Sequence, residues 1–269
     1  MIRIPHVLSK KNRALLSELV RTDFKLRYQG SVLGYIWSLL RPLLLFTILY
    51  LVFIKFLKVN YGVPHSAVYL LVGIVLWSFF LEMTSGCVSS IVGRGDLIRK
   101  IRIPRWLIVI SSSLSAVISL LLNIIVIAIF MVLNHVAVSA DILWLPLIVL
   151  EMYVFGIGIA FFLSAAFVKY RDISYIWEVI CQALFYLTPL LYPVAKLHWP
   201  IVREIIFSSP LSQTVQDARY TIVTHKTYTI SQAFPSFWPR LIPFAVVVVT
   251  FLIGVSYFRK KSKTFAEDI

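Results

Sequence analysis

Two ionisable side chains lie inside long apolar runs, where a charge is costly unless it is paired or hydrated. Arg41 lies ten residues past Ser31 in the run 32–54, and Glu82 lies nine residues before the end of the run 66–91. At about 1.5 Å per helical residue, they would lie about 15 and 13 Å deep, at matching levels. Charged side chains at such depth pair with an opposite charge, extend to the membrane surface, or line the pathway of a substrate or ion. Arg41 is thus predicted to pair with Glu82 or to reach inward, or alternatively to meet an anionic substrate in a conduit.

Aromatic side chains offer a second kind of binding chemistry, because their flat faces pack against apolar surfaces such as the C–H faces of sugar rings. They concentrate in the first and fifth apolar runs. These residues are Tyr35, Trp37, Tyr175, Trp177, Phe185, Tyr186 and Tyr192. Two interpretations remain open for them, ordinary helix packing and the lining of a glycan conduit. Four tryptophans instead fit the aromatic belts of a membrane interface: Trp77, Trp144, Trp199 and Trp238.

Catalytic motifs are missing from the sequence. No glycine-rich phosphate loop precedes either Lys-Thr pair, Lys226-Thr227 or Lys263-Thr264, so the chain has no evident means of using ATP itself. No His-Glu-x-x-His or Gly-x-Ser-x-Gly sequence occurs. The two cysteines, Cys87 and Cys181, lie in apolar runs and are interpreted as buried hydrophobic residues. We therefore expect no catalytic, cofactor or metal residues and no enzyme.

The composition points to a membrane protein. The 269 residues are 59% hydrophobic and only 14% charged, whereas soluble domains have about 25% charged residues. The net charge of +14 lies in short segments between apolar runs. This placement sets membrane topology and argues against nucleic-acid binding.

Six apolar stretches reach the roughly 20 residues that cross a membrane as a helix. They are 32–54, 66–91, 106–133, 142–167, 174–194 and 237–258. Lys and Arg number 18 in the segments on one side and 6 on the other, which places both termini in the cytoplasm. The predicted fold is all-α, a single membrane domain 1–269 composed of a cytoplasmic N-terminus (1–31), a six-span region (32–258) and a cytoplasmic tail (259–269).

The N-terminal segment 13–28 predicts an amphipathic helix that lies in the inner membrane interface. Its apolar face is interrupted by Asp23 and Arg27. Gly30 suits a left-handed helix end and Ser31 suits the cap of the next helix. An in-plane helix would thus turn into the first span at this point.

Two loops also have helical character. The cytoplasmic loop 92–105 has a short apolar face, with Asp96 as a plausible N-cap and Pro104 as the stop. It is interpreted either as a lipid-surface helix or as the contact helix for a cytoplasmic partner. The outer segment 195–236 follows a break at 188–193 and is apolar enough to dip back into the membrane.

Four stretches resemble permease subunits of type-2 ABC exporters, in the branch that exports O-antigen, capsule and teichoic acid polymers. They are "LRYQGSVLGYIWSLLRPLL" (26–44), "LIRKIRIPRWLIVISSSLSAVI" (97–118), "KYRDISYIWEVICQALFYLTPLLYP" (169–193) and "SPLSQTVQDARYTIV" (209–223). The resemblance covers about residues 10 to 260.

This resemblance implies a homodimer in the cytoplasmic (inner) membrane, with a conduit between the subunits lined by spans one and five. It also implies two copies of a separate ABC ATPase, which would hold ATP and Mg²⁺, and two short re-entrant helices in the outer segment 195–236. A coupling helix would dock on the ATPase, formed here by Asp96, Leu97, Ile98, Arg99, Lys100, Ile101 and Arg102.

The substrate implied is a glycan on a polyprenyl pyrophosphate or similar membrane lipid. Lys25, Arg27 and Arg41 would attract its phosphates. Two alternatives remain. One is a type-2 ABC permease for a drug or simple lipid, and the other is a membrane glycosyltransferase or phosphatase.

Overall fold

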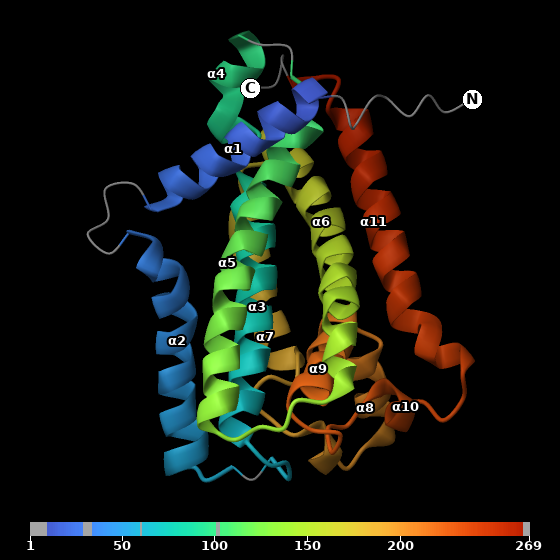
Figure 1. Cartoon of the computed structure of the whole chain (residues 1–269). Coiled ribbons are helices and arrows are strands. Elements are labelled where there is room, and N and C mark those ends of the chain that lie inside the picture. Colours follow the sequence, from blue (N-terminus) through green and yellow to red (C-terminus); the bar gives the residue numbers. More distant parts are fainter. Residues whose placement is uncertain (1–9, 29–33, 60, 101–102, 266–269) are drawn as a thin grey trace.

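The computed structural model describes residues 10–28, 34–59, 61–100 and 103–265, and its regular elements are all helical. Long helices run side by side, and shorter ones cross their two ends (Figure 1). The predicted all-α class is therefore confirmed. Gly30 and Ser31, the predicted turn before the first span, lie outside the described residues.

Five described segments have the length and apolar composition to cross a membrane. Two of them are single helices, Ser66–Val88 (α3) and Trp106–Leu133 (α5). The first segment, Trp37–Phe56, consists of α2 (Trp37–Leu49) and a π-helix (Tyr50–Phe56). The other two each begin with a 3-10 turn: Ala140–Lys169 contains Ala140–Trp144 and α6 (Leu145–Lys169), and Trp238–Lys261 contains Trp238–Leu241 and α11 (Ile242–Lys261).

The fifth predicted span is shorter than expected. Its helix, α7 (Ile173–Leu187), has 15 residues, or about 22 Å at the usual rise, against a hydrocarbon core of about 30 Å. It ends where Pro189 cannot continue a helix. Five of the six predicted spans thus correspond to helical segments long enough to cross a membrane. The sixth crossing stays a prediction.

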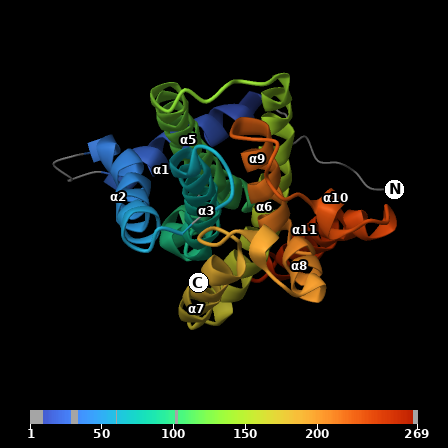
Figure 2. The ribbon, with the colours of Figure 1, turned by 90° about the horizontal axis from the view of Figure 1, so that it is seen from below.

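Helix α3 is the centre of the bundle. Its apolar window is 78% buried within the chain, against 11% for α2. It packs against α2, α5, α6, α7 and α9, and the view along the bundle shows these helices arranged around it (Figure 2). A helix that is apolar on most of its surface is expected in this position, since most of its faces contact protein.

Helix α11 lies against α6 through two glycines. A Cβ atom on Gly254 would overlap the carbonyl oxygen of Gly158, and one on Gly158 would lie 2.9 Å from the backbone nitrogen of Phe251. Small residues let membrane helices approach this closely. The two backbones are therefore in direct contact.

Helix α1 (Lys10–Tyr28) crosses one end of the bundle (Figure 1) and packs against α5. Leu19 is buried, and Glu18 on the opposite face is exposed. Asp23, which interrupts the apolar face, forms an ion pair with Arg94. The Ser111 hydroxyl lies 2.9 Å from both Arg94 Nη1 and Asp23 Oδ2. Asp23 thus connects α1 to the segment between α3 and α5.

That connection holds a 3-10 turn, Val92–Arg94, and the short helix α4 (Gly95–Lys100). Helix α4 lies at the same end of the bundle as α1 and the end of α11 (Figure 1). At the opposite end are α8 (Pro200–Phe207), α9 (Pro210–Ile222) and α10 (Ile230–Ala233), and a 3-10 turn, Val194–Lys196, precedes them.

A buried arginine anchors this opposite end. Arg219 of α9 has no exposed surface, and its Cζ lies 4.0 Å from the centre of the Tyr69 ring. Its guanidinium donates to the carbonyl oxygens of Tyr69, Pro189 and Leu190 and to Gln216 Oε1, at 2.6–3.1 Å. Non-helical backbone inside a membrane protein needs internal partners. Arg219 supplies them to the break after α7.

Candidate functional site

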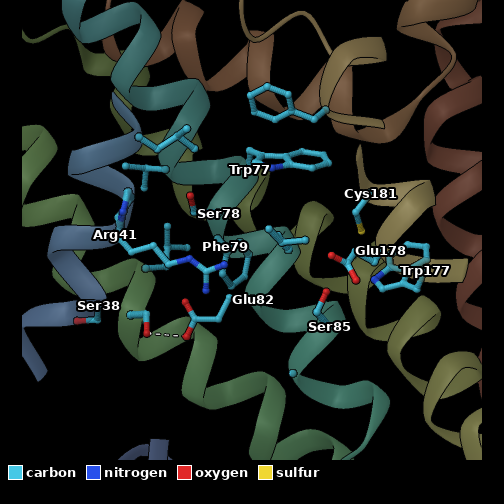
Figure 3. A pocket seen from close by; sticks show the side chains of 18 of the residues that line it. Ser38, Arg41, Trp77, Ser78, Phe79, Glu82, Ser85, Trp177, Glu178 and Cys181 are labelled. Carbon is cyan, nitrogen blue, oxygen red and sulfur yellow. Dashed lines mark hydrogen bonds between the residues drawn. The ribbon is translucent and has the colours of Figure 1, made fainter. Parts of the chain in front are cut away.

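A pocket of about 1170 Å³ lies between α2, α3, α5 and α7 (Figure 3). Its volume is above the roughly 300–1,000 Å³ usual for sites that hold one small molecule. One part of its wall is polar and another is aromatic. It thus has room for an extended ligand with both kinds of surface.

The polar wall contains both ions that the sequence placed at matching depth. Arg41 extends from α2 and Glu82 from α3, and both line the pocket (Figure 3). The Ser119 hydroxyl donates to Glu82 Oε1 at 2.8 Å. Both side chains thus belong to one pocket, as their matching depth predicted. Their direct pairing stays a prediction.

Helix α5 contributes a row of polar residues at four-residue spacing. Ser111, Ser115, Ser119 and Asn123 are all buried, and this spacing places them on one helix face. Asn123 Nδ2 donates to the carbonyl oxygens of Ser119 and Ser38, at 2.8 and 3.1 Å. Such polar contacts hold membrane helices together. Here they join α2 to α5 at the edge of the pocket.

The aromatic wall is formed by α2, α3 and α7. Trp177 donates from Nε1 to Thr84 Oγ1 at 3.3 Å, and the rings of Trp77 and Phe185 meet edge to face at 5.5 Å. Both tryptophans are almost fully buried, whereas Trp37 and Tyr186 are 42% and 70% exposed. The last two rings therefore have free faces for a ligand.

The structure brings together four of the predicted conduit residues. Trp37, Trp177, Phe185 and Tyr186 line the pocket. Tyr175 and Tyr192 do not: Tyr175 is exposed elsewhere on α7, and the Tyr192 hydroxyl donates to Leu187 O. The seventh, Tyr35, falls in the 3-10 turn Gly34–Ile36, and its side chain lies outside the described part.

The predicted phosphate-binding residues do not form one site. Arg41 lines the pocket, but Lys25 is exposed on α1 and does not. The side chain of Arg27 is outside the described part. Lys25 on α1 and Arg41 in the pocket lie at separate places along the bundle. They would therefore contact a lipid phosphate at different positions.

Five of the predicted coupling residues lie in α4, from Asp96 to Lys100. Asp96 and Arg99 are exposed, whereas Leu97 and Ile98 are half-buried, which matches the predicted amphipathic turn. Ile101 and Arg102 lie outside the described residues, as does the side chain of Lys100.

Sequence reasoning placed Trp77 wrongly and missed Asn123. Trp77 was assigned to an interfacial belt, but it is near the middle of α3 and lines the pocket. Trp77 lies next to the polar face of α3, where Ser78, Glu82 and Ser85 recur at helical spacing and line the same pocket, and this spacing was the available signal. The four-residue spacing from Ser111 to Asn123 was the available signal for the polar wall.

The lining of the pocket has groups that can bind a polar ligand. Within the described residues, no group of three or more His, Cys, Asp or Glu side chains is placed to hold a metal ion. The pocket instead offers aromatic faces, hydroxyls, two amides, one guanidinium and two carboxylates. These groups can bind a polar ligand.

Comparisons with known proteins match this picture. Residues 14–223 match the family described as ABC-2 type transporter. The chain is 27% identical over 274 residues to the "O-antigen export system permease protein RfbA" of Myxococcus xanthus, with all of both chains covered. A protein of the same name from Klebsiella pneumoniae is 28% identical over 258 residues, with 94% of each chain covered. Another from that organism is 29% identical over 203 residues, 74% of this chain and 78% of the relative.

Proposed function

Because this chain belongs to the ABC-2 type transporter family, we propose that it is the transmembrane subunit of an exporter for a lipid-linked, O-antigen-like polysaccharide. A subunit of this kind is a transporter permease and not an enzyme. The relatives named as O-antigen export permeases, which match over nearly the whole chain, support the substrate class. The pocket between α2 and α7 carries the proposal, since aromatic faces beside hydroxyl-binding groups suit a sugar chain.

ATP would be used by a partner. The chain contains no glycine-rich phosphate loop, so we assign ATP and Mg²⁺ to a separate cytoplasmic ABC ATPase, present in two copies. The α4 helix is the proposed contact, because its charged residues face outward at the end of the bundle that also holds α1. Closure of the ATPase pair would push this helix.

A second copy of the chain would complete the conduit. Large apolar side chains are exposed along α7, among them Tyr175, Val179 and Tyr186, at 65–70%. A pocket that opens beside such a surface suits a path between two subunits. The conduit would then have α2 and α7 of both copies as its walls.

The proposed topology has six spans in the cytoplasmic membrane, with both termini in the cytoplasm. Helix α7 with the segment 188–193 would form the sixth crossing, and α8 and α9 would be short re-entrant helices at the outer surface. The bias of basic residues supports this orientation. Helix α1 would lie in the inner interface, where Lys25 and Arg27 attract the lipid phosphate.

Depletion of the protein in its host tests the proposal. After sugar labelling, extracted lipids should contain long lipid-linked polymer that accumulates on the cytoplasmic side. If surface glycan disappears without such accumulation, the protein acts in biosynthesis and the proposal is wrong. If neither pool changes, the exported substrate is not this glycan, and a drug or simple lipid becomes the better candidate.

A further inference from the structure

Two carboxylates share one hydrogen-bond donor where α9 packs against α6, at the end of the bundle opposite α1 (Figure 1). Gln213 of α9 donates from Nε2 to Asp217 Oδ2 at 3.0 Å and to Glu151 Oε2 of α6 at 3.5 Å. Since one nitrogen reaches both acceptor oxygens, the two carboxylates are near neighbours. Among the described residues, neither of them forms an ion pair.

The buried atoms of this group lack donors. Gln213 is 2% exposed, and its Oε1 and Glu151 Oε1 are buried without a hydrogen-bond partner in the described part of the chain. A flipped amide would place Oε1 against both carboxylates. A proton on either carboxyl group turns an acceptor into a donor. Because the two oxygens are shielded from solvent, a proton is a partner that they can gain without added space.

Among the described residues, the elements packed against α6 and α9 offer no positive charge to these acids. The arginines at this end each donate to backbone carbonyl oxygens instead: Arg203, Arg219 and Arg240. His225 pairs with Asp141 at 2.7 Å. The other titratable groups that α3, α7, α8 and α9 place at this end are acidic or phenolic: Tyr69, Tyr186, Glu204 and Tyr220. Helices α5 and α11 add none at this end.

Two ionised carboxylates this close repel each other, and burial removes the water that would screen them. Close acid pairs relieve this repulsion by sharing a single proton. Burial raises the pKa of Asp217 to about 6, although the hydrogen bond from Gln213 acts to lower it. With one proton bound, the pair has less repulsion and a second donor, so α9 is held against α6.

Loss of that proton would affect a second contact of α9. Asp217 and Arg219 lie close together on this helix, and Arg219 donates to the carbonyl oxygens of Pro189 and Leu190 in the break after α7. Displacement of α9 from α6 would therefore also move the guanidinium that satisfies this break. The acid pair is thus placed to control how firmly this end of the bundle is closed.

We propose that Glu151 and Asp217 share one proton and act as a proton-dependent latch between α6 and α9. With the proton bound, α9 is held on α6. Without it, repulsion between the two carboxylates loosens the end of the bundle opposite α1. In the proposed topology this end faces the outside of the membrane, so the external pH would set the state of the latch. The inference does not depend on which substrate is transported.

Denaturant unfolding of the full chain in detergent, followed by tryptophan fluorescence, tests the latch. A native state that binds more protons than the unfolded state loses stability as pH rises. For Asp217 this loss falls between its ordinary pKa of 3.8 and about 6, at up to about tenfold in the folding constant per pH unit. Asp217→Asn and Glu151→Gln keep the shape of the side chain and remove one charge. The ratio of each variant's folding constant to that of the wild type should therefore rise with pH.

Glu18→Gln, on the exposed face of α1, is the matched control, and its ratio to the wild type should stay constant with pH. Amide hydrogen exchange then locates the effect. At neutral pH, residues 210–222 of α9 should exchange several-fold more slowly in Asp217→Asn than in the wild type, whereas α5 should exchange equally in both. Comparison at a single pH removes the pH dependence of the exchange chemistry.

Three results would overturn the inference. The first is a stability ratio of Asp217→Asn and Glu151→Gln to the wild type that does not change with pH. The second is a loss of stability in both variants at every pH, which would show that both carboxylates are needed in ionised form. The third is equal exchange of α9 in Asp217→Asn and the wild type. None of these results bears on the export function, since no substrate enters the assay.

Discussion

Substitution of Gly73 by alanine tests how tightly the end of the bundle opposite α1 is fixed. Gly73 lies one helical turn after Tyr69 on α3, opposite the buried guanidinium of Arg219. A Cβ at this position would lie 3.0 Å from Arg219 Cζ and 3.3 Å from its Nε. Four hydrogen bonds and the Tyr69 ring hold that guanidinium in place. It therefore cannot yield to the new methyl group without losing a partner.

The expected cost follows from two effects. Overpacking a filled interior costs about 1–3 kcal/mol. Displacing the guanidinium from one of its acceptors adds about 1.5–3 kcal/mol, the value of a hydrogen bond to a charged group. Gly73→Ala should thus lower the free energy of unfolding by about 2.5–6 kcal/mol.

A double-mutant cycle with Arg219→Ala isolates the contact. Denaturant unfolding of the purified protein in detergent would be followed by tryptophan fluorescence. In the Arg219→Ala background the added methyl group has no guanidinium to meet, so Gly73→Ala should cost much less there. Gly93→Ala is the control, because no atom lies within 4 Å of the Cβ built at that glycine. Equal costs in both backgrounds would show that the Arg219 contact is not what excludes a side chain at position 73.

Three further perturbations test other parts of the structure. Gly254→Leu should separate α11 from α6 and lower the thermal unfolding temperature of the purified protein by several degrees, whereas an unchanged temperature would contradict the direct backbone contact. Asp23→Asn removes the charge that pairs with Arg94, so α1 should become more accessible to proteolysis, and equal cleavage rates would show that the ion pair does not hold this helix. Reversing the charges of Arg99, Lys100 and Arg102 should abolish export and the substrate-stimulated ATPase activity while the protein still reaches the membrane. Export at the wild-type level would place the ATPase contact elsewhere.

The membrane helices were largely predictable because hydropathy responds directly to the solvent they lie in. The predicted stretch 106–133 matches α5 residue for residue. The main disagreement is 174–194, where hydropathy continues past Leu187 but the helix does not. Thr188-Pro189 breaks the backbone while keeping the segment apolar, and a hydropathy window does not register such a break.

The pocket was predictable only in part. Arg41 and Glu82 were placed at one level because the rise of a helix is fixed. Which aromatic residues face the pocket depends on how α2 and α7 are rotated about their axes. That rotation is set by packing between helices and not by the pattern within one of them, so Trp37 and Tyr186 could not be told apart from Tyr175.

The sequence did not indicate that Arg219 is buried and donates to backbone carbonyl groups. It was included only among the basic residues of the predicted outer segment 195–236. Three of its four acceptors, the carbonyl oxygens of Tyr69, Pro189 and Leu190, are far away along the chain. Nothing in a local window marks an arginine as fully buried. The glycine that makes room for it, Gly73, belongs to another helix and gave no separate signal.

The contacts of Arg219 also set an order for biogenesis. A chain is synthesised from its N-terminus, so Pro189 and Leu190 leave the ribosome before the arginine that satisfies their carbonyl groups. Until α9 has been made, the break after α7 lacks the guanidinium that donates to these two carbonyl groups. If the proposed topology holds, a nascent or truncated chain that stops before residue 219 would carry unsatisfied backbone within the membrane. Membrane quality-control proteases would have a physical basis for telling such a fragment from the finished protein.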